Sequence, residues 1–219
     1  VDLATSGAVN FALFVVLASS TFLVIVVVAL FCGDTVASEA SWSSLRYLLA
    51  LPVDRGRLLR QKFLVSSGLA LSGLVILPTS AVLAGGLLFG WEAARTPAGA
   101  VIPAGEALFR LAIVTAYLAL ALLVVAALAF CLSVYTDAPL GAVGGAVMLV
   151  ILSSILDQVE DLGVVREYLP THYLGAWIDA INDPIVWGEM ARGVLLSLAY
   201  SSVLLALAWR KFRRKDIVS

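Results

Sequence analysis

The sequence predicts an all-α polytopic membrane protein with five transmembrane helices. Of its 219 residues, 62% are hydrophobic and only 13% are charged, whereas soluble domains carry about 25% charged residues. The apolar residues form continuous blocks of about the 20 residues that a helix needs to cross a bilayer. These blocks lack the alternation of outer-membrane barrel strands, and a helix satisfies its backbone hydrogen bonds internally, as lipid requires.

Five blocks are expected to span the membrane. They cover about residues 9–31, 63–90, 107–135, 139–156 and 187–209. The second block is long enough to tilt, and Pro78 within it predicts a kink. Between the last two blocks, residues 157–186 are expected to form a pair of short helices or a re-entrant hairpin. In this segment Asp183 and Pro184 are expected to start a helix, because Asp is a good cap and Pro suits the first turn.

The distribution of Lys and Arg predicts the orientation. Five of the 14 basic residues lie in the loop over residues 33–62, and five lie after Trp209. By the positive-inside rule, the basic loop and the C-terminus should be cytoplasmic in a bacterial inner membrane. Five spans then place the N-terminus outside. Since the sequence begins at Val1 rather than at Met, we expect one more span upstream, and therefore six in the full subunit.

The loop over residues 33–62 is the most informative segment. Trp42, Leu45 and Leu49 recur there at helical spacing, and Pro52 should end this helix because the residue before a proline disfavours helical conformation. Asp54 is then expected to cap the next helix. Two interpretations remain open, namely an interfacial helix that only links two spans and a docking helix for a cytoplasmic partner.

This loop also resembles a known family. Its residues include, in order, Gly33-Asp34, Glu39, Ser44-Leu45-Arg46-Tyr47-Leu48-Leu49, Leu51-Pro52-Val53, Arg55, Leu58-Leu59 and Lys62. The run is similar to the corresponding loop in the membrane subunits of bacterial ABC-2 type ABC transporters. Ser43-Ser44 departs from the family, which often has Gly-Thr at this place. The ending from Phe212 to Ile217 also resembles the end of these permeases.

The resemblance implies a type V exporter-like permease subunit that moves a hydrophobic or amphipathic compound, such as a drug, lipid or peptide. It implies a second permease subunit, in a homodimer or a heterodimer, and two cytoplasmic ATP-binding subunits. ATP and Mg would bind to those partners, because this sequence contains no phosphate-binding Gly-x-x-x-x-Gly-Lys-Ser/Thr loop. The chain itself is expected to be no enzyme and to bind no cofactor. Its ATPase-coupling residues would be Glu39, Trp42, Arg46 and Leu49.

The remaining features give further expectations. Gly141 and Gly145 form a GxxxG pair, which allows close helix packing either within the subunit or across a dimer. The single histidine, His172, predicts no metal site. Cys32 and Cys131 are expected to be small core residues rather than a disulfide.

No ionisable residue is expected deep in a span, which argues against coupling to protons or sodium. Membrane lipid is an expected partner and nucleic acid is not. No residue is assigned to the substrate path. The alternative to transport is a membrane-embedded assembly or structural subunit without its own translocation path.

Overall fold

The computed structural model describes residues 5–42, 54–95 and 101–214. In order, the elements are α1 (Ala8–Ser20), α2 (Leu23–Ser41), α4 (Arg55–Phe89), β1 (Ala94–Arg95), β2 (Val101–Ile102), α5 (Ala104–Ala121), α6 (Leu123–Tyr135), α7 (Pro139–Asp157), η1 (Glu160–Tyr168), η2 (His172–Ala180) and α8 (Gly188–Arg213). The two strands form only a two-residue antiparallel hairpin. The all-α fold class is therefore confirmed.

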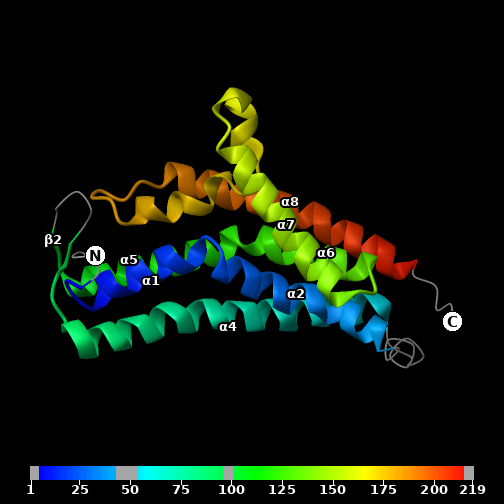
Figure 1. The fold of residues 1–219 in the computed structure, drawn as a ribbon, viewed down its shortest axis with the longest axis horizontal. Coiled ribbons are helices and arrows are strands. Elements are labelled where there is room, and N and C mark those ends of the chain that lie inside the picture. Colours follow the sequence, from blue (N-terminus) through cyan, green and yellow to red (C-terminus); the bar gives the residue numbers. More distant parts are fainter. Residues whose placement is uncertain (1–4, 43–53, 96–100, 215–219) are drawn as a thin grey trace.

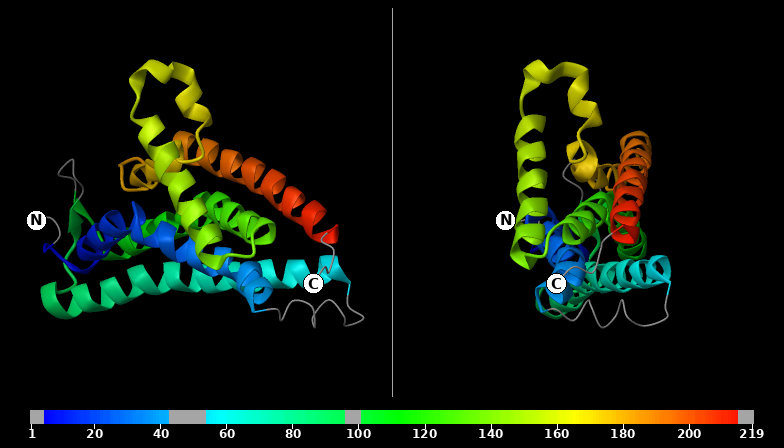
Figure 2. Two further views of the ribbon diagram at one scale, coloured as in Figure 1. Left: turned by 45° about the vertical axis from the view of Figure 1, so that its right-hand side comes forward. Right: turned by 90° about the vertical axis from the view of Figure 1, so that its right-hand side faces the viewer.

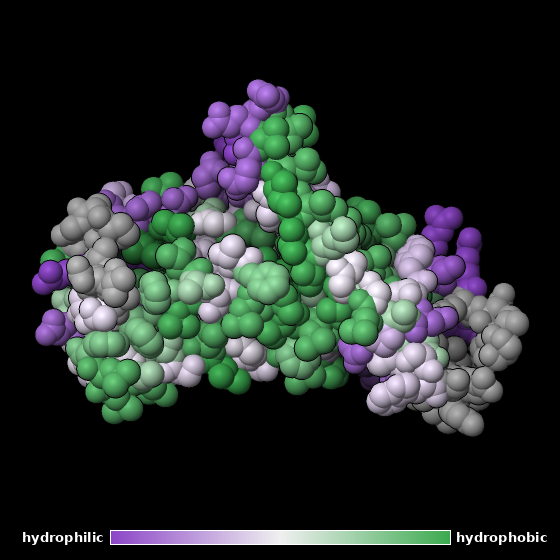
Figure 3. Space-filling view, in the orientation of Figure 1, coloured by the Kyte–Doolittle hydropathy of each residue, from purple (hydrophilic) through white to green (hydrophobic). Residues whose placement is uncertain are grey.

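Within the described ranges, five helical segments are long and apolar enough to cross a membrane, which is the number that the sequence predicts. They are Leu23–Ser41, Arg55–Phe89, Ala104–Tyr135, Pro139–Asp157 and Gly188–Arg213. Helices α1, α2, α4, α5 and α6 follow the long axis of the molecule (Figure 1). Apolar side chains cover its middle, and hydrophilic ones gather toward the ends and around η1 (Figure 3). This distribution suits a multi-pass membrane protein, whose middle faces lipid.

The first predicted span, residues 9–31, is wrong in its bounds. The helix breaks at Thr21 and Phe22, and α2 then continues to Ser41. The prediction from hydropathy ended this span too early, because the last turns of α2 contain polar residues. These side chains form hydrogen bonds to the backbone of their own helix, so the helix continues through them. The hydroxyl of Thr35 donates to the Phe31 carbonyl at 2.6 Å, for example. Such bonds to the preceding turn are common for Ser and Thr in helices.

The third predicted span, residues 107–135, is also two helices, which meet at Leu122. At this break the hydroxyl of Ser197 on α8 lies 2.8 Å from the Leu120 carbonyl and 3.3 Å from the Val124 amide. Backbone groups freed at a helix break are costly in an apolar surrounding unless they find a partner. Ser197 therefore stabilises the break from a distant part of the sequence.

Helix α4 begins as the sequence predicts, with Asp54 at the N-cap. Its Oδ2 accepts a hydrogen bond from the Arg57 amide at 2.8 Å. The helix then continues through Pro78 for 35 residues and lies against both α1 and α2. A Cβ atom at Gly85 would lie only 2.9 Å from the Ala8 carbonyl oxygen, so glycine permits the close approach of α1.

Helix α7 matches the fourth predicted span and rises steeply from the bundle, with η1 at its end (Figure 2). Its buried face consists of Ala142, Ala146, Val150 and Ser153. A Cβ at Gly145 would meet Leu132 of α6 at 3.4 Å. Gly145 thus faces a helix of its own chain, which agrees with packing within the subunit. A contact of Gly141 across a dimer stays a prediction.

Cys32 and Cys131 are both free and buried, as the sequence predicts. Cys32 is completely buried and Cys131 is 6% exposed.

Candidate functional site

The described parts of the two basic segments lie at the same end of the molecule, where α2 and α8 end and α4 begins (Figure 1). The start of α4 and the end of α8 approach each other closely at Gly56. A Cβ atom added to this glycine would lie 3.6 Å from Nη2 of Arg213 and 3.8 Å from Nε1 of Trp209. Lys211 of α8 also lies over the ring of Tyr135, 5.6 Å from its centroid. We call this region, made of residues 38–42, 54–62 and 209–214, the basic end.

An ion pair joins α2 to α4 within the basic end. The carboxylate of Glu39 accepts from the ammonium group of Lys62, and their side chains are 28% and 12% exposed. Because both groups are largely removed from water, the loss of either partner would leave a poorly hydrated charge. The pair therefore holds the last turn of α2 against the first turns of α4.

The four residues predicted to contact an ATPase fall into three situations. Glu39 is directed to Lys62 of its own chain rather than to open surface. Trp42, directly after α2, is 81% exposed. Arg46 and Leu49 lie outside the described residues, as does most of the helix predicted around them. The structure therefore shows that Glu39 is paired and that Trp42 is exposed, and a coupling role for all four residues stays a prediction.

A cleft of about 770 Å³ lies between α2 and α4 and reaches the basic end. Its walls combine apolar side chains with charged and amide groups. The apolar ones include Leu30, Phe31, Val65 and Leu69, and the polar ones include Asp34, Glu39, Gln61 and Lys62. Sequence analysis did not find this cleft, because it ended the first span at residue 31 and did not extend that helix to Ser41, alongside the start of α4.

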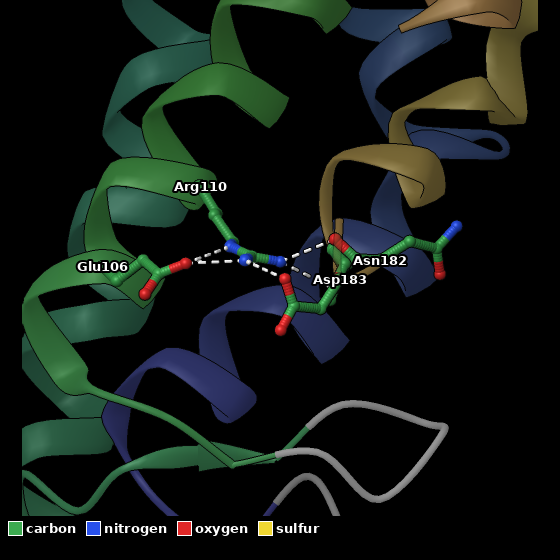
Figure 4. Close-up of polar contacts among 5 residues, drawn as sticks. Glu106, Arg110, Asn182 and Asp183 are labelled. Carbon is green, nitrogen blue, oxygen red and sulfur yellow. Dashed lines mark hydrogen bonds and ion pairs between the residues drawn. The ribbon is translucent and has the colours of Figure 1, made fainter. Parts of the chain in front are cut away.

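A second polar centre surrounds Arg110 of α5 (Figure 4), and this helix begins at the end of the molecule opposite to the basic end (Figure 1). The Arg110 side chain is 6% exposed. Its Nε and Nη2 donate to Glu106 at 3.0 and 2.6 Å, and its Nη1 donates to the carbonyls of Ile181 and Asn182 at 3.1 and 2.7 Å. Nη2 also lies 3.4 Å from Oδ1 of Asp183. Arg110 thus ties α5 to the chain that leads into α8.

Arg110 explains why the predicted helix start at Asp183 and Pro184 is wrong. Helix α8 begins at Gly188, and the Asp183 carboxylate is occupied by Arg110 instead of capping a helix. Sequence analysis gave Arg110 no role. The available signal was its position four residues after Glu106, a spacing that places an acid and a base on one helix face.

Residues 157–187, which we call the η segment, contain two short helices where the sequence predicted a helix pair or a hairpin. Side chains of three surrounding helices hold this segment. Tyr117 of α5 donates to the Tyr173 carbonyl at 2.5 Å, and Tyr200 of α8 donates to the Tyr168 carbonyl at 2.7 Å. Ser153 of α7 bonds to Thr171 at 2.8 Å. The η segment is therefore a packed part of the fold.

The sole histidine of the sequence, His172, takes part in this packing. Nδ1 of His172 lies 2.5 Å from Oδ1 of Asp157, and Arg166 lies 3.8 Å from the same oxygen. Among the described residues, no group of three or more His, Cys, Asp and Glu side chains is placed to hold a metal. Asp157, the last residue of α7, thus forms a hydrogen bond with His172 of η2 and an ion pair with Arg166 of η1.

Two aromatic residues of η2 are buried. Trp177 is only 3% exposed, so it is a core residue. Burial raises the pKa of the Tyr173 hydroxyl, and the nearby carboxylates of Glu189 and Glu167 raise it further. Tyr173 therefore stays protonated at neutral pH.

A cavity of about 300 Å³ lies beneath this segment, between α6, α7 and α8, with a mainly aliphatic lining.

Comparison with known protein families gives one match. A family model described as "Protein of unknown function (DUF2705)" matches residues 4–218. The match includes every helix described above. No curated protein matches the chain.

Proposed function

The chain belongs to the DUF2705 family, and we propose that it is the transmembrane permease subunit of an ATP-driven, ABC-2 type exporter. Three features support this function. They are the five long apolar helices, the η segment packed before the last of them, and the ABC-2-like sequence over residues 33–62. A hydrophobic or amphipathic compound would be moved across the inner membrane, while a separate partner subunit binds and hydrolyses ATP with Mg.

The architecture of the basic end is the observation that carries the proposal. Two long helices, α2 and α4, are joined by the ion pair of Glu39 and Lys62, and Trp42 is exposed directly after α2. A force applied near Trp42 would act on both helices together, because the ion pair and their packing oppose separation. A motor subunit docked there could therefore move a large part of the bundle.

Assembly follows from the same proposal. Two ATP-binding subunits would dock beneath two permease subunits, which are either identical or different. Helix α7 offers an exposed apolar face for the second permease subunit. Leu140, Met148, Leu152 and Ile155 on this helix are between 45% and 87% exposed. In a membrane such a face can meet either lipid or another helix.

Exchange of Trp42 for Asp tests the docking surface. In the W42D variant, a tagged chain purified from native membranes in mild detergent is expected to lose most of its ATP-binding partner, because exposed aromatics commonly dominate interface energies. The W187D variant is the matched control, since Trp187 is also exposed, at 56%, but adjoins the start of α8.

Quantitative mass spectrometry of the purified complexes measures the result. Equal loss of the partner in both variants would contradict docking at Trp42. If an ATP-binding partner is retained by the wild type but reconstituted complexes show no ATP-dependent export, the chain is instead an assembly subunit.

A further inference from the structure

The cleft between α2 and α4 is amphipathic along its length. One stretch of its wall is formed by Leu30, Phe31, Val65 and Leu69, and the stretch toward the basic end carries Asp34, Glu39 and Lys62. Leu30 and Asp34 are four residues apart on α2, so they occupy the same helix face one turn from each other. The apolar and charged parts of the wall are therefore adjacent.

The charged part of the cleft has an excess of negative charge. Glu39 is neutralised by Lys62. Asp34 is exposed, and it forms no ion pair with any residue in the three described ranges. It lies within α2, a segment apolar enough to cross the membrane. A carboxylate on such a helix is costly against lipid and is normally matched by a partner.

We propose that this cleft binds an amphiphile with an ammonium headgroup. The headgroup pairs with the carboxylate of Asp34, and the alkyl chain lies along Phe31, Val65 and Leu69. The volume of about 770 Å³ is within the range of about 300–1,000 Å³ that is typical of small-molecule sites. Charge complementarity selects a cation, and the continuous apolar wall selects an attached alkyl chain over a free ion.

This binding requires neither an ATPase partner nor transport. It can therefore be tested on the isolated chain, and its failure would not affect the proposed permease function. Two sources offer the same chemistry, namely an ethanolamine phospholipid of the surrounding bilayer and a free cationic amphiphile.

The test compares ligands by native mass spectrometry of the purified chain in neutral maltoside micelles. In the first arm, dioleoylphosphatidylethanolamine competes with dioleoylphosphatidylglycerol. In the second arm, dodecylammonium competes with dodecanol. The D34N variant is expected to lower retention of the ammonium ligand relative to its competitor about fivefold, as for one partly exposed ion pair. D34E should retain the wild-type ratio, and E160Q, which changes an exposed carboxylate of η1, should leave it unchanged.

If D34N lowers retention of the ammonium ligand relative to its competitor in the first arm, the lipid is a ligand. If it does so in the second arm, the free amphiphile is a ligand. Either result supports the site. Equal ratios for wild type and D34N in both arms would overturn it and would mean that Asp34 is only hydrated. Size-exclusion profiles and melting temperatures should match between the two proteins because Asp34 is exposed. An equal drop in E160Q would also overturn the proposal, since the effect would then reflect net charge alone.

Discussion

Replacement of Arg110 by alanine is expected to lower the free energy of unfolding by about 3 kcal/mol. The guanidinium group contacts two carboxylates and two backbone carbonyls from a nearly buried position. The effect should be at the low end for a buried charge, because the side chains of Glu106 and Asp183 are 48% and 63% exposed and can be hydrated again. Thermal unfolding in detergent measures the loss, and hydrogen exchange over residues 172–187 should become faster.

Two variants make this result specific to Arg110. The unfolding free energy of R110K should lie between those of the wild type and R110A, because an ammonium group lacks the planar fork that reaches both Glu106 and the two carbonyls. R192A should change stability by less than about 1 kcal/mol, since Arg192 pairs with Glu189 on the surface and the two side chains are 64% and 48% exposed. Wild-type melting and exchange in R110A would show that Arg110 does not hold the η segment.

Charge reversal at Glu39 or Lys62 is expected to have the second largest effect. E39K places two ammonium groups together and K62E places two carboxylates together, in a site where the native side chains are 28% and 12% exposed. Each single variant should lose about 2 kcal/mol of unfolding free energy, below the range for fully buried pairs. In the proposed complex, each should also reduce ATP-driven export.

The double variant E39K/K62E separates the pair from its surroundings. It restores opposite charges with their positions exchanged, so most of the stability and export should return. Thermal unfolding and transport assays of the wild type, the two single variants and the double variant complete the cycle. If the double variant is no more stable than the single variants, the pair does not hold α2 against α4.

The features that depend on local sequence were predictable. The bounds of α7 follow from an apolar block that begins at Pro139, and the start of α4 follows from the capping residue Asp54. Both helix boundaries can be predicted from neighbouring residues alone. The five-helix composition was likewise evident, because block length and hydropathy are properties of single segments.

The features that were missed depend on contacts between distant segments. The break at Leu122 is satisfied by Ser197 of α8, which lies more than 70 residues later in the sequence. Asp183 did not cap a helix because Arg110 binds it from α5. Hydropathy also ended the first span before the polar turns of α2, and this error hid the cleft that α2 forms with α4. In the first two cases a tertiary contact overrode a local preference, whereas the extension of α2 is supported by hydrogen bonds within the helix itself.

The candidate coupling site shows the same division. The resemblance to ABC-2 permeases made Glu39 and Trp42 candidates for coupling. It did not indicate that Glu39 is directed toward Lys62, whereas Trp42 is left exposed. The distinction matters functionally, because Trp42 is the residue expected to touch a partner and Glu39 the one expected to transmit its movement.

The central claim is that the basic end lies in the cytoplasm, where a motor subunit has access to ATP. Cysteine labelling of intact cells tests it most directly. Single cysteines at Arg214 and Glu160, both exposed, are introduced into a background with Cys32→Ala and Cys131→Ala. We predict that a membrane-impermeant maleimide labels E160C in intact cells and R214C only after permeabilisation. Labelling of R214C but not of E160C in intact cells would contradict the claim.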